Sequence, residues 1–215
     1  EAGCVVKFEG GAIGKGSVSI SAATTSIEEA LGGGRNVIVL ALPAFAVSTA
    51  ARLLAPHLLP SHVVIIVGSP SVSSLRFRLA VSKDISTQRF AVAEASSLPY
   101  AARLVSPGHV DIIRRSQGLR MAAFPLNDSD RVFPIAQKLI PGIALATSIV
   151  HIAFSCENMV LHPATLLMNL GSVETREFIF YKEGVSPSVA KVIEEIDSDR
   201  MIVAKALKVP NCEPL

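Results

Sequence analysis

The sequence predicts an α/β fold in which a parallel sheet is followed by an all-helical second domain. Between residues 36 and 69, an apolar run, a segment of helical spacing and a second apolar run succeed one another, which is the order of a strand, a crossover helix and a parallel strand. From Pro141 onward the strand signals stop and the chain becomes helical. We therefore expect one domain over residues 1–140 and the start of a second over residues 141–215.

Charge and cysteine usage argue against several classes of partner. The 20 basic and 18 acidic residues leave a net charge of +2 with no cationic run, so we expect no nucleic-acid partner. Prolines and histidines interrupt the long uncharged stretches, so we expect buried strands and core helices and no membrane partner. The three cysteines are far apart and form no CxxC pair, which favours a reducing compartment. Because the sequence shows no signal peptide, a cytoplasmic location is expected.

The first segment, CVVKFEGGAIGKGSVSIS, predicts two short strands joined by a glycine-rich loop. Its Gly14-Lys15-Gly16 could be mistaken for a phosphate cradle, but it fits neither fingerprint. A GxGxxG motif would need glycine where Ser19 stands, and a Walker A motif would need glycine at Glu9 and a hydroxyl residue at Gly16. We interpret the loop as a hairpin turn.

A strand-helix-strand unit follows. Ser26 is placed to cap a short helix that ends at the glycines of residues 32–34. Residues 37–42 are continuously apolar and branched, as in a parallel strand covered on both faces. Residues 44–55 can form the crossover helix and residues 63–67 the next parallel strand. The unit predicts a partial Rossmann-type sheet with a right-handed crossover.

Ligands of open parallel sheets lie beyond the carboxyl ends of the strands. This rule puts Leu42, Pro43 and the turn at Gly68-Ser69-Pro70 on the expected binding rim. His57 and His62 lie among prolines near the end of the crossover helix, but two histidines alone make a poor metal site. We assign them no chemistry and expect no metal.

The rest of the first domain is less regular. Residues 71–86 indicate an amphipathic helix and a polar loop, and residues 89–93 a strand that runs into a prolyl turn. Two further strands, which could be antiparallel, are expected at residues 109–113 and 119–124. Residues 128–139 have helical spacing.

The last helix is expected from Ser186, a favourable N-cap, and Pro187, a favourable first residue. A packed amphipathic helix should follow, with one apolar stripe formed by Val189, Val192, Ile193, Ile196, Val203 and Leu207.

One histidine in this second domain is a candidate for chemistry. A residue before proline is pushed away from helical backbone angles, so we expect His162 just before a helix that begins at Pro163. The positive end of that helix would favour a neutral imidazole, the form that a general acid/base needs. A structural histidine is the alternative interpretation. His151, within the apolar run TSIVHIAF, is expected to be a satisfied core histidine.

Several motifs occur in a fixed order along the chain. The upstream segments are LALPAFAV and AEASSLPYAARL. Downstream stand His162-Pro163, Asn169 with Gly171, Tyr181 with Glu183-Gly184, Ser186-Pro187, and Asp197 with Arg200. Over nearly the whole chain this series resembles the NAD/NADP octopine/nopaline dehydrogenase family, the opine dehydrogenases.

The resemblance implies reductive condensation of an amino acid with a 2-oxo acid such as pyruvate, using NAD or NADP. It also implies a Rossmann-type domain followed by a helical domain like the C-terminal one of 6-phosphogluconate dehydrogenase. His162 would act as general acid/base, and Ser97 would offer a hydroxyl to the carboxylate of the oxo acid. Asn169 would bind substrate or brace its helix, and Leu42 and Pro43 would lie beside the cofactor.

Some family features are missing from this sequence. It lacks the glycine-rich turn that holds the pyrophosphate, and the family's carboxylate partner for the histidine and its arginine for the oxo acid would lie beyond Leu215. Ala102 replaces a family cysteine. We interpret Glu174, Tyr181 and Glu183 as structural or interdomain residues. The alternatives are a truncated non-catalytic paralogue acting as an interaction module, with self-association through exposed apolar ends, and a ketopantoate-reductase-like NAD(P) reductase.

Overall fold

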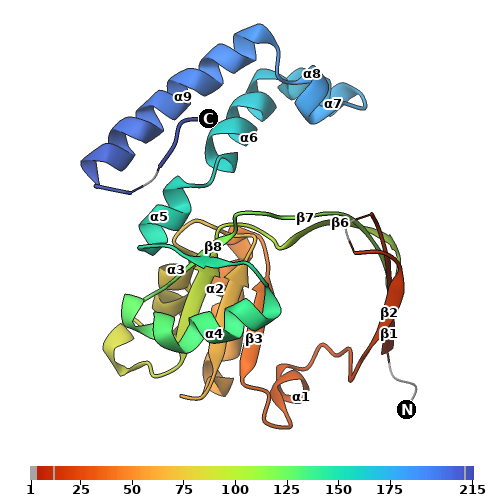
Figure 1. Ribbon diagram of the computed structural model, residues 1–215, viewed down its shortest axis with the longest axis vertical. Coiled ribbons are helices and arrows are strands. Elements are labelled where there is room, and N and C mark those ends of the chain that lie inside the picture. Colours follow the sequence, from red (N-terminus) through yellow and green to blue (C-terminus); the bar gives the residue numbers. More distant parts are fainter. Residues whose placement is uncertain (1–3, 12, 211) are drawn as a thin grey trace. The chain divides into compact units, whose positions relative to one another are not determined.

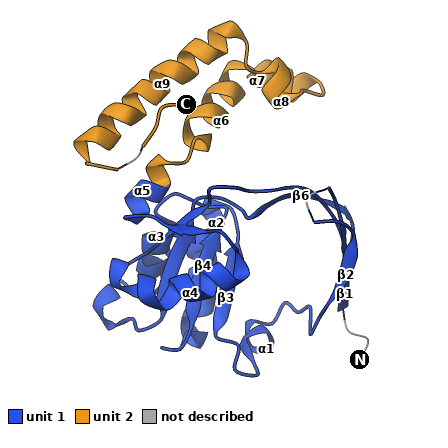
Figure 2. Cartoon of the chain, viewed as in Figure 1, with its two compact units in different colours: residues 1–152 blue, residues 153–215 orange. Residues whose placement is uncertain are grey.

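The structure, a computed structural model, describes residues 4–11, 13–210 and 212–215 (Figure 1). The chain divides into two compact units, Glu1–Ile152 and Ala153–Leu215 (Figure 2). The expected domain boundary, between residues 140 and 141, lies earlier in the chain. We had expected strands to end before Pro141. The short strand β9 (Ala144–Leu145) lies beyond that residue, however, and pairs with the sheet of the first unit.

The main sheet of the first unit has five strands in the order β3-β4-β5-β8-β9. The strands β3, β4 and β5 run parallel, β8 is antiparallel to β5, and β9 is parallel to β8. This arrangement confirms the predicted strand-helix-strand unit and the α/β class. The bounds of the four longer strands are Val37–Ala41, Val63–Val67, Ala91–Ala95 and Arg120–Ala123.

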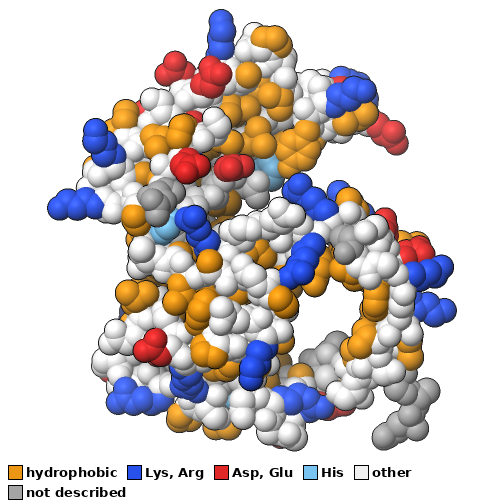
Figure 3. Space-filling view, viewed as in Figure 1, with side chains coloured by type: hydrophobic (Ala, Val, Ile, Leu, Met, Phe, Trp, Pro, Cys, Tyr) orange, Lys and Arg blue, Asp and Glu red, His pale blue; other side chains and the backbone are white. Residues whose placement is uncertain are grey.

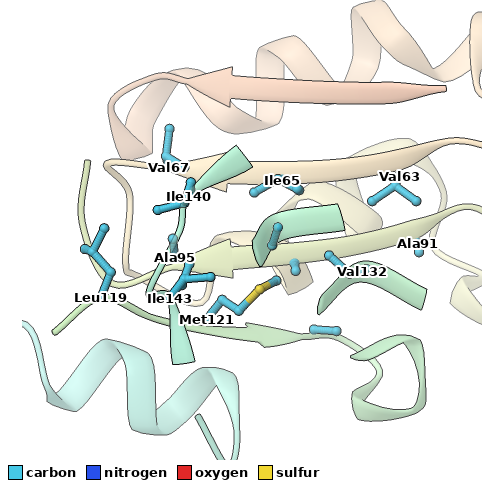
Figure 4. Packing of buried hydrophobic residues seen from close by; sticks show 13 residues of the cluster. Val63, Ile65, Val67, Ala91, Ala95, Leu119, Met121, Val132, Ile140 and Ile143 are labelled. Atoms are coloured by element: carbon cyan, nitrogen blue, oxygen red, sulfur yellow. The ribbon is translucent and has the colours of Figure 1, made fainter. Parts of the chain in front are cut away.

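Helices cover both faces of this sheet. The helices α2 (Ala44–Leu54) and α3 (Ser73–Val81) pack on one face, and α4 (Ser129–Leu139) packs on the other (Figure 1). Side chains of β4 alternate between the two faces, so that Val63, Ile65 and Val67 join the cluster under α4 (Figure 4). All five residues of β4 are buried, and burial of each aliphatic side chain contributes on the order of 2 kcal/mol.

The edge strand β3 corrects one expectation. We expected it to be covered on both faces, but Val37 and Val39 are 40% and 51% exposed. The reason is its position at the edge of the sheet, where only the face toward α2 is covered, so that Ile38 alone is buried. The apolar pattern alone therefore did not distinguish an edge strand from a central one.

A second sheet has the order β2-β1-β7-β6. The strands β1 (Cys4–Glu9) and β2 (Gly16–Ile20) form the predicted antiparallel hairpin. The strand β6 (Tyr100–Ser106) was not anticipated, and it pairs antiparallel with β7 (His109–Arg115). Strands were expected at residues 109–113 and 119–124, and both are present, but they do not form the antiparallel pair that we had considered. The turn at Gly108, whose φ is 74°, joins β6 and β7 into a hairpin, and β8 belongs to the other sheet.

The remaining short elements connect these layers. Ser26 accepts a hydrogen bond from the Glu29 backbone at 3.3 Å and caps α1 (Ile27–Leu31), as predicted. Short 3₁₀ turns occupy Ala55–His57, Ile85–Thr87 and Leu126–Asp128.

The second unit is helical, and α5 (Ile149–Phe154) leads into it. Its further helices are α6 (Asn158–Met168), α7 (Leu170–Thr175), α8 (Phe180–Glu183) and α9 (Pro187–Ala206). Its core joins α6 to α9 through Val160, Ala164, Val189 and Ile193. Among the described residues, no helix combines the length and the apolar character needed to cross a membrane.

The buried stripe of α9 differs from the expected one. Ser186 caps the helix by accepting a hydrogen bond from the Val189 backbone, as predicted. The stripe continues, however, through a buried ion pair in which Arg200 contacts Asp197 at 2.7 Å. Arg200 also donates to the backbone of Glu213, so this pair fixes the chain that follows α9. Four of the apolar residues that we expected in the stripe are at least 37% exposed, namely Val192, Ile196, Val203 and Leu207.

Candidate functional site

The position of His162 differs from our expectation. The helix α6 begins at Asn158, with the backbone of Val160 and Leu161 bonded to the Glu157 carbonyl, so His162 and Pro163 both lie inside it. Proline removes one backbone donor from a helix, and the residue before it is disfavoured in the helical region without being excluded. The start of α6 at Asn158 therefore overrides the local signal. The argument that the positive end of a helix keeps His162 neutral does not apply.

The imidazole of His162 makes a direct contact with α8. Its Nε2 lies 2.7 Å from the Tyr181 hydroxyl, and its ring meets the Phe180 ring edge to face at a centroid distance of 5.5 Å. We had interpreted Tyr181 as structural, so this contact was missed. The adjacent aromatic pair Phe-Tyr in the downstream motif was the available signal. The hydrogen bond fixes the orientation of the ring, while His162 itself stays half-buried.

Hydrogen bonds from the Asn169 side chain to backbone carbonyls hold the short helix α8 over α6. Asn169 donates from its amide nitrogen to the carbonyls of Thr165 and Gly184 at 2.8 and 2.9 Å. A Cβ at Gly184 would collide with the Phe180 carbonyl and lie 2.7 Å from Thr165 Cγ2, so this position requires glycine. Asn169 thus braces the turn that carries Tyr181, and its role in binding substrate stays a prediction.

A pocket of about 640 Å³ opens beside the His162 ring. Its lining residues come from α6 and α8 and are mostly apolar: His162, Pro163, Leu166, Leu167, Phe180 and Tyr181. Hydrophobic side chains gather on the visible face of the helical unit (Figure 3). An imidazole at the edge of an apolar pocket can exchange a proton with a ligand that the pocket holds.

The other predicted residues lie at the carboxyl edge of the parallel strands. Leu42 and Pro43 follow β3, and the Ser69 hydroxyl, after β4, donates to the Leu42 carbonyl. Gly68 has a φ of 81°, and a Cβ there would lie 3.1 Å from the side chain of Leu98 in the loop after β5. Three loops thus converge on one rim, and Ser97 is exposed in the third of them. His162 and Asn169 belong to the other unit.

A buried carboxylate close to this rim was missed by the sequence reasoning. Glu94, in β5, is fully buried, and its Oε2 accepts hydrogen bonds from the backbone and the hydroxyl of Ser74, both at 2.7 Å. Its Oε1 has no hydrogen-bond partner. Burial raises the pKa of Glu94 to about 7, and the bonds from Ser74 oppose this rise. The one acidic residue in an otherwise apolar strand was the signal.

His151 and His62 are structural histidines. His151 is buried, with Nε2 at 3.0 Å from Arg120 and Nδ1 at 3.1 Å from the Thr147 hydroxyl. Burial, with the nearby Arg120 charge, lowers the pKa of His151. The expectation of a satisfied core histidine is confirmed. His62 is also buried and accepts a hydrogen bond from the Leu59 backbone. The part of the chain that the structure describes contains no group of three metal-ligating side chains.

Comparison with known proteins confirms the family resemblance. Residues 145–215 match the family model described as NAD/NADP octopine/nopaline dehydrogenase, alpha-helical domain. The chain is 25% identical over 182 residues to an opine dehydrogenase of Arthrobacter sp. (strain 1C), covering 83% of this chain and 50% of that protein. It therefore spans about half the length of the curated relative that it matches.

Solved structures of low sequence identity share the fold. An octopine dehydrogenase with NADH and L-arginine superposes with a TM-score of 0.71 at 18% identity, over 99% of this chain and 55% of that one. An apo yersinopine dehydrogenase gives 0.76 at 17% identity, over 95% and 53%. A 2-dehydropantoate 2-reductase from Geobacter metallireducens GS-15 gives 0.65 at 14% identity, over 97% and 64%. The predicted fold class, a Rossmann-type sheet followed by a helical domain, is confirmed.

Proposed function

Since residues 145–215 match the alpha-helical domain of the octopine/nopaline dehydrogenase family, we propose that the protein is an NAD(P)-dependent opine dehydrogenase. Its reaction would join the amine of an amino acid to the carbonyl carbon of a 2-oxo acid such as pyruvate. The observation that carries the proposal is the His162 imidazole, oriented by Tyr181 at the edge of a pocket.

His162 would move the protons of this reaction. Starting from the ammonium form of the amino acid, formation of the carbon–nitrogen double bond takes two protons from the nitrogen and gives two to the carbonyl oxygen, which becomes first a hydroxyl and then water. One imidazole can accept each proton from the nitrogen and pass it to the oxygen. The hydroxyl of Tyr181 would keep the ring aligned during both transfers.

In this proposal the loops after β3, β4 and β5 would hold the cofactor. The missing side chain at Gly68 lets Leu98 approach the loop after β4 closely, and Leu42 and Pro43 offer an uncharged surface on the same rim. The residues that would hold the cofactor are those of this rim. As far as the structure describes it, the rim includes no glycine-rich pyrophosphate turn. When bound there, NAD(P)H would supply the hydride that reduces the carbon–nitrogen double bond. In this proposal Ser97 offers its hydroxyl to the carboxylate of the oxo acid.

The two units would then divide the work. Residues 1–140 would form the dinucleotide-binding part, and residues 141–215 would begin the substrate domain, with Asn169 as a further candidate for contact with substrate. The partners would be small molecules in the cytoplasm, and any self-association would be secondary to catalysis.

A second candidate, a ketopantoate-reductase-like NAD(P) reductase, is favoured by the structural likeness to the 2-dehydropantoate 2-reductase. That reading would not explain why residues 145–215 match the opine dehydrogenase helical domain. A non-catalytic paralogue is the third candidate, and it would bind neither nucleotide.

The test uses the complete gene product that contains this chain. NADH and NADPH binding is followed by fluorescence titration, and cofactor oxidation is followed with pyruvate, with mixed amino acids, and with both. We expect oxidation only with both substrates, and His162→Ala should abolish turnover while leaving nucleotide binding unchanged. His57→Ala, a change at a histidine outside the candidate site, is the matched control. Oxidation with ketopantoate alone would favour the reductase, and absence of nucleotide binding would favour the non-catalytic paralogue.

A further inference from the structure

The pocket beside His162 has a lining chemistry that bears on the choice of amino acid. Its volume, about 640 Å³, is in the range of small-molecule sites, about 300–1,000 Å³. Four of its six lining residues are Pro163, Leu166, Leu167 and Phe180, which carry no polar side-chain atom. The polar atoms of the lining side chains belong to the His162 ring and the Tyr181 hydroxyl, which bond each other.

A positively charged side chain would find no acceptor of opposite charge in this lining. The acidic residue of α8, Glu183, is already paired with Arg176 at 2.7 Å, and that guanidinium also lies 5.8 Å from the centre of the Phe178 ring. A guanidinium or ammonium group held in the pocket would lose hydration without gaining a carboxylate. When His162 carries a proton, its charge would repel a cation as well.

Binding of an apolar side chain in the pocket should instead be favourable, because it removes apolar surface from water. Leu166 and Leu167 are 41% and 68% exposed on α6, so a hydrocarbon group in the pocket would remove their surface from water. Phe180 and Tyr181 pack edge to face at a centroid distance of 5.1 Å and present ring surface to the same space. The leucines and the two rings together offer a hydrophobic wall on each of the two helices.

We infer that the pocket receives the side chain of the amino-acid substrate and selects an aliphatic or aromatic one over a basic one. The inference rests on the proposed function, because the pocket is assigned to the amino acid through its contact with His162. It places Leu166 and Leu167 as residues that determine specificity, since they form the helical wall opposite the aromatic pair.

The experiment compares amino acids in the complete gene product at fixed pyruvate and NAD(P)H. We expect kcat/KM for leucine and phenylalanine to exceed that for alanine and for arginine by at least about tenfold, since a single methylene in an apolar pocket is worth about tenfold or more. Leu167→Glu should reduce kcat/KM for leucine by about tenfold and raise the relative rate with arginine. Because Leu167 is exposed and glutamate is a good helix former, α6 should stay folded.

The matched control is Leu53→Glu, at a leucine of α2 with 58% exposure that lies outside the pocket. It should leave the order of preference unchanged. The inference is overturned if arginine or another charged amino acid is the best substrate, or if Leu167→Glu leaves the preference as it was. It is also overturned if light scattering shows that Leu167→Glu only dissociates a dimer, which would make the pocket a face between copies.

The two proposals fail in different ways. Turnover with pyruvate and only basic or acidic amino acids would leave the opine dehydrogenase reading intact and remove the inference. Absence of turnover with every pair of amino acid and 2-oxo acid would remove the proposed function, and the inference with it.

Discussion

His151 and His162 occupy similar stretches of apolar sequence and have opposite surroundings. His151 is buried, and both of its ring nitrogens have partners, Arg120 and Thr147. His162 is half-buried, has Tyr181 as a hydrogen-bond partner, and lines a pocket. An imidazole in an apolar helix is a candidate for chemistry only when its ring borders a space that a ligand can enter. A fully bonded ring in the core has no capacity to receive a ligand.

The largest effect is expected for a substitution of His162, the histidine that lines the pocket. His162→Asn keeps a polar side chain of similar reach but removes the acid/base group, so kcat should fall by about 10²- to 10⁴-fold. Thermal unfolding followed by circular dichroism should change little, because the ring is not part of the core cluster. A variant that loses stability and activity together would show that His162 is structural and would break the comparison.

The second prediction concerns Glu94, which, like His151, is a buried titratable group of the first unit. Glu94 has a pKa of about 7 in the folded chain, against 4.5 as its ordinary value. Its protonated form is therefore favoured by folding, so stability is fully present below pH 4.5 and falls as pH rises towards 7, by on the order of 3 kcal/mol. Glu94→Gln, which stays neutral, should flatten this slope in denaturant titrations.

Glu28→Gln, at an exposed carboxylate of α1, is the control for that measurement and should leave the slope unchanged. If the unaltered protein and Glu94→Gln show the same dependence of stability on pH, burial does not govern the ionisation of Glu94.

The third prediction concerns His151, the buried histidine. His151→Leu leaves Arg120 and Thr147 without their ring partner and should reduce the free energy of unfolding by about 1–3 kcal/mol. Michaelis constants should be unchanged, since the residue faces the core. His57→Leu is the matched control. A loss of turnover without a loss of stability would reverse the roles that we assign to the two histidines.

The smallest effect sharpens the role of the Tyr181 hydroxyl. Tyr181→Phe keeps the ring in the pocket wall and removes the bond to His162, so kcat should fall by about tenfold with KM nearly constant. The pH dependence of kcat/KM should also shift, which a purely structural tyrosine would not cause. Tyr100→Phe, at the other tyrosine of the chain, is the control. An unchanged pH profile would make Tyr181 a packing residue only.

Sequence patterns predicted the elements that depend on local signals. The apolar run of β4 and the caps at Ser26 and Ser186 were read correctly, because propensity and burial agree there. The candidate role of His162 was reached from its neighbour Pro163, although that proline lies inside α6 and does not begin it. A local rule about proline gave way to a helix that starts earlier.

Contacts between distant residues could not be predicted in this way. The bond between His162 and Tyr181 depends on the fold of the α8 turn, and the bond between Glu94 and Ser74 depends on how α3 meets the end of β5. The strand β6 was missed because its side chains are mostly exposed, so it lacks the apolar alternation that marks a half-buried strand.

Gly184 has a consequence for how this site tolerates change. The absent side chain lets the α8 turn sit against Thr165 and Phe178, and any Cβ would collide with the backbone carbonyl of Phe180. The cost is set by the first carbon of the side chain, so alanine should be nearly as harmful as tryptophan. In a saturation-mutagenesis library, codon 184 should therefore show a uniform depletion of every replacement, whereas the exposed pocket position at codon 167 should show depletion graded by polarity.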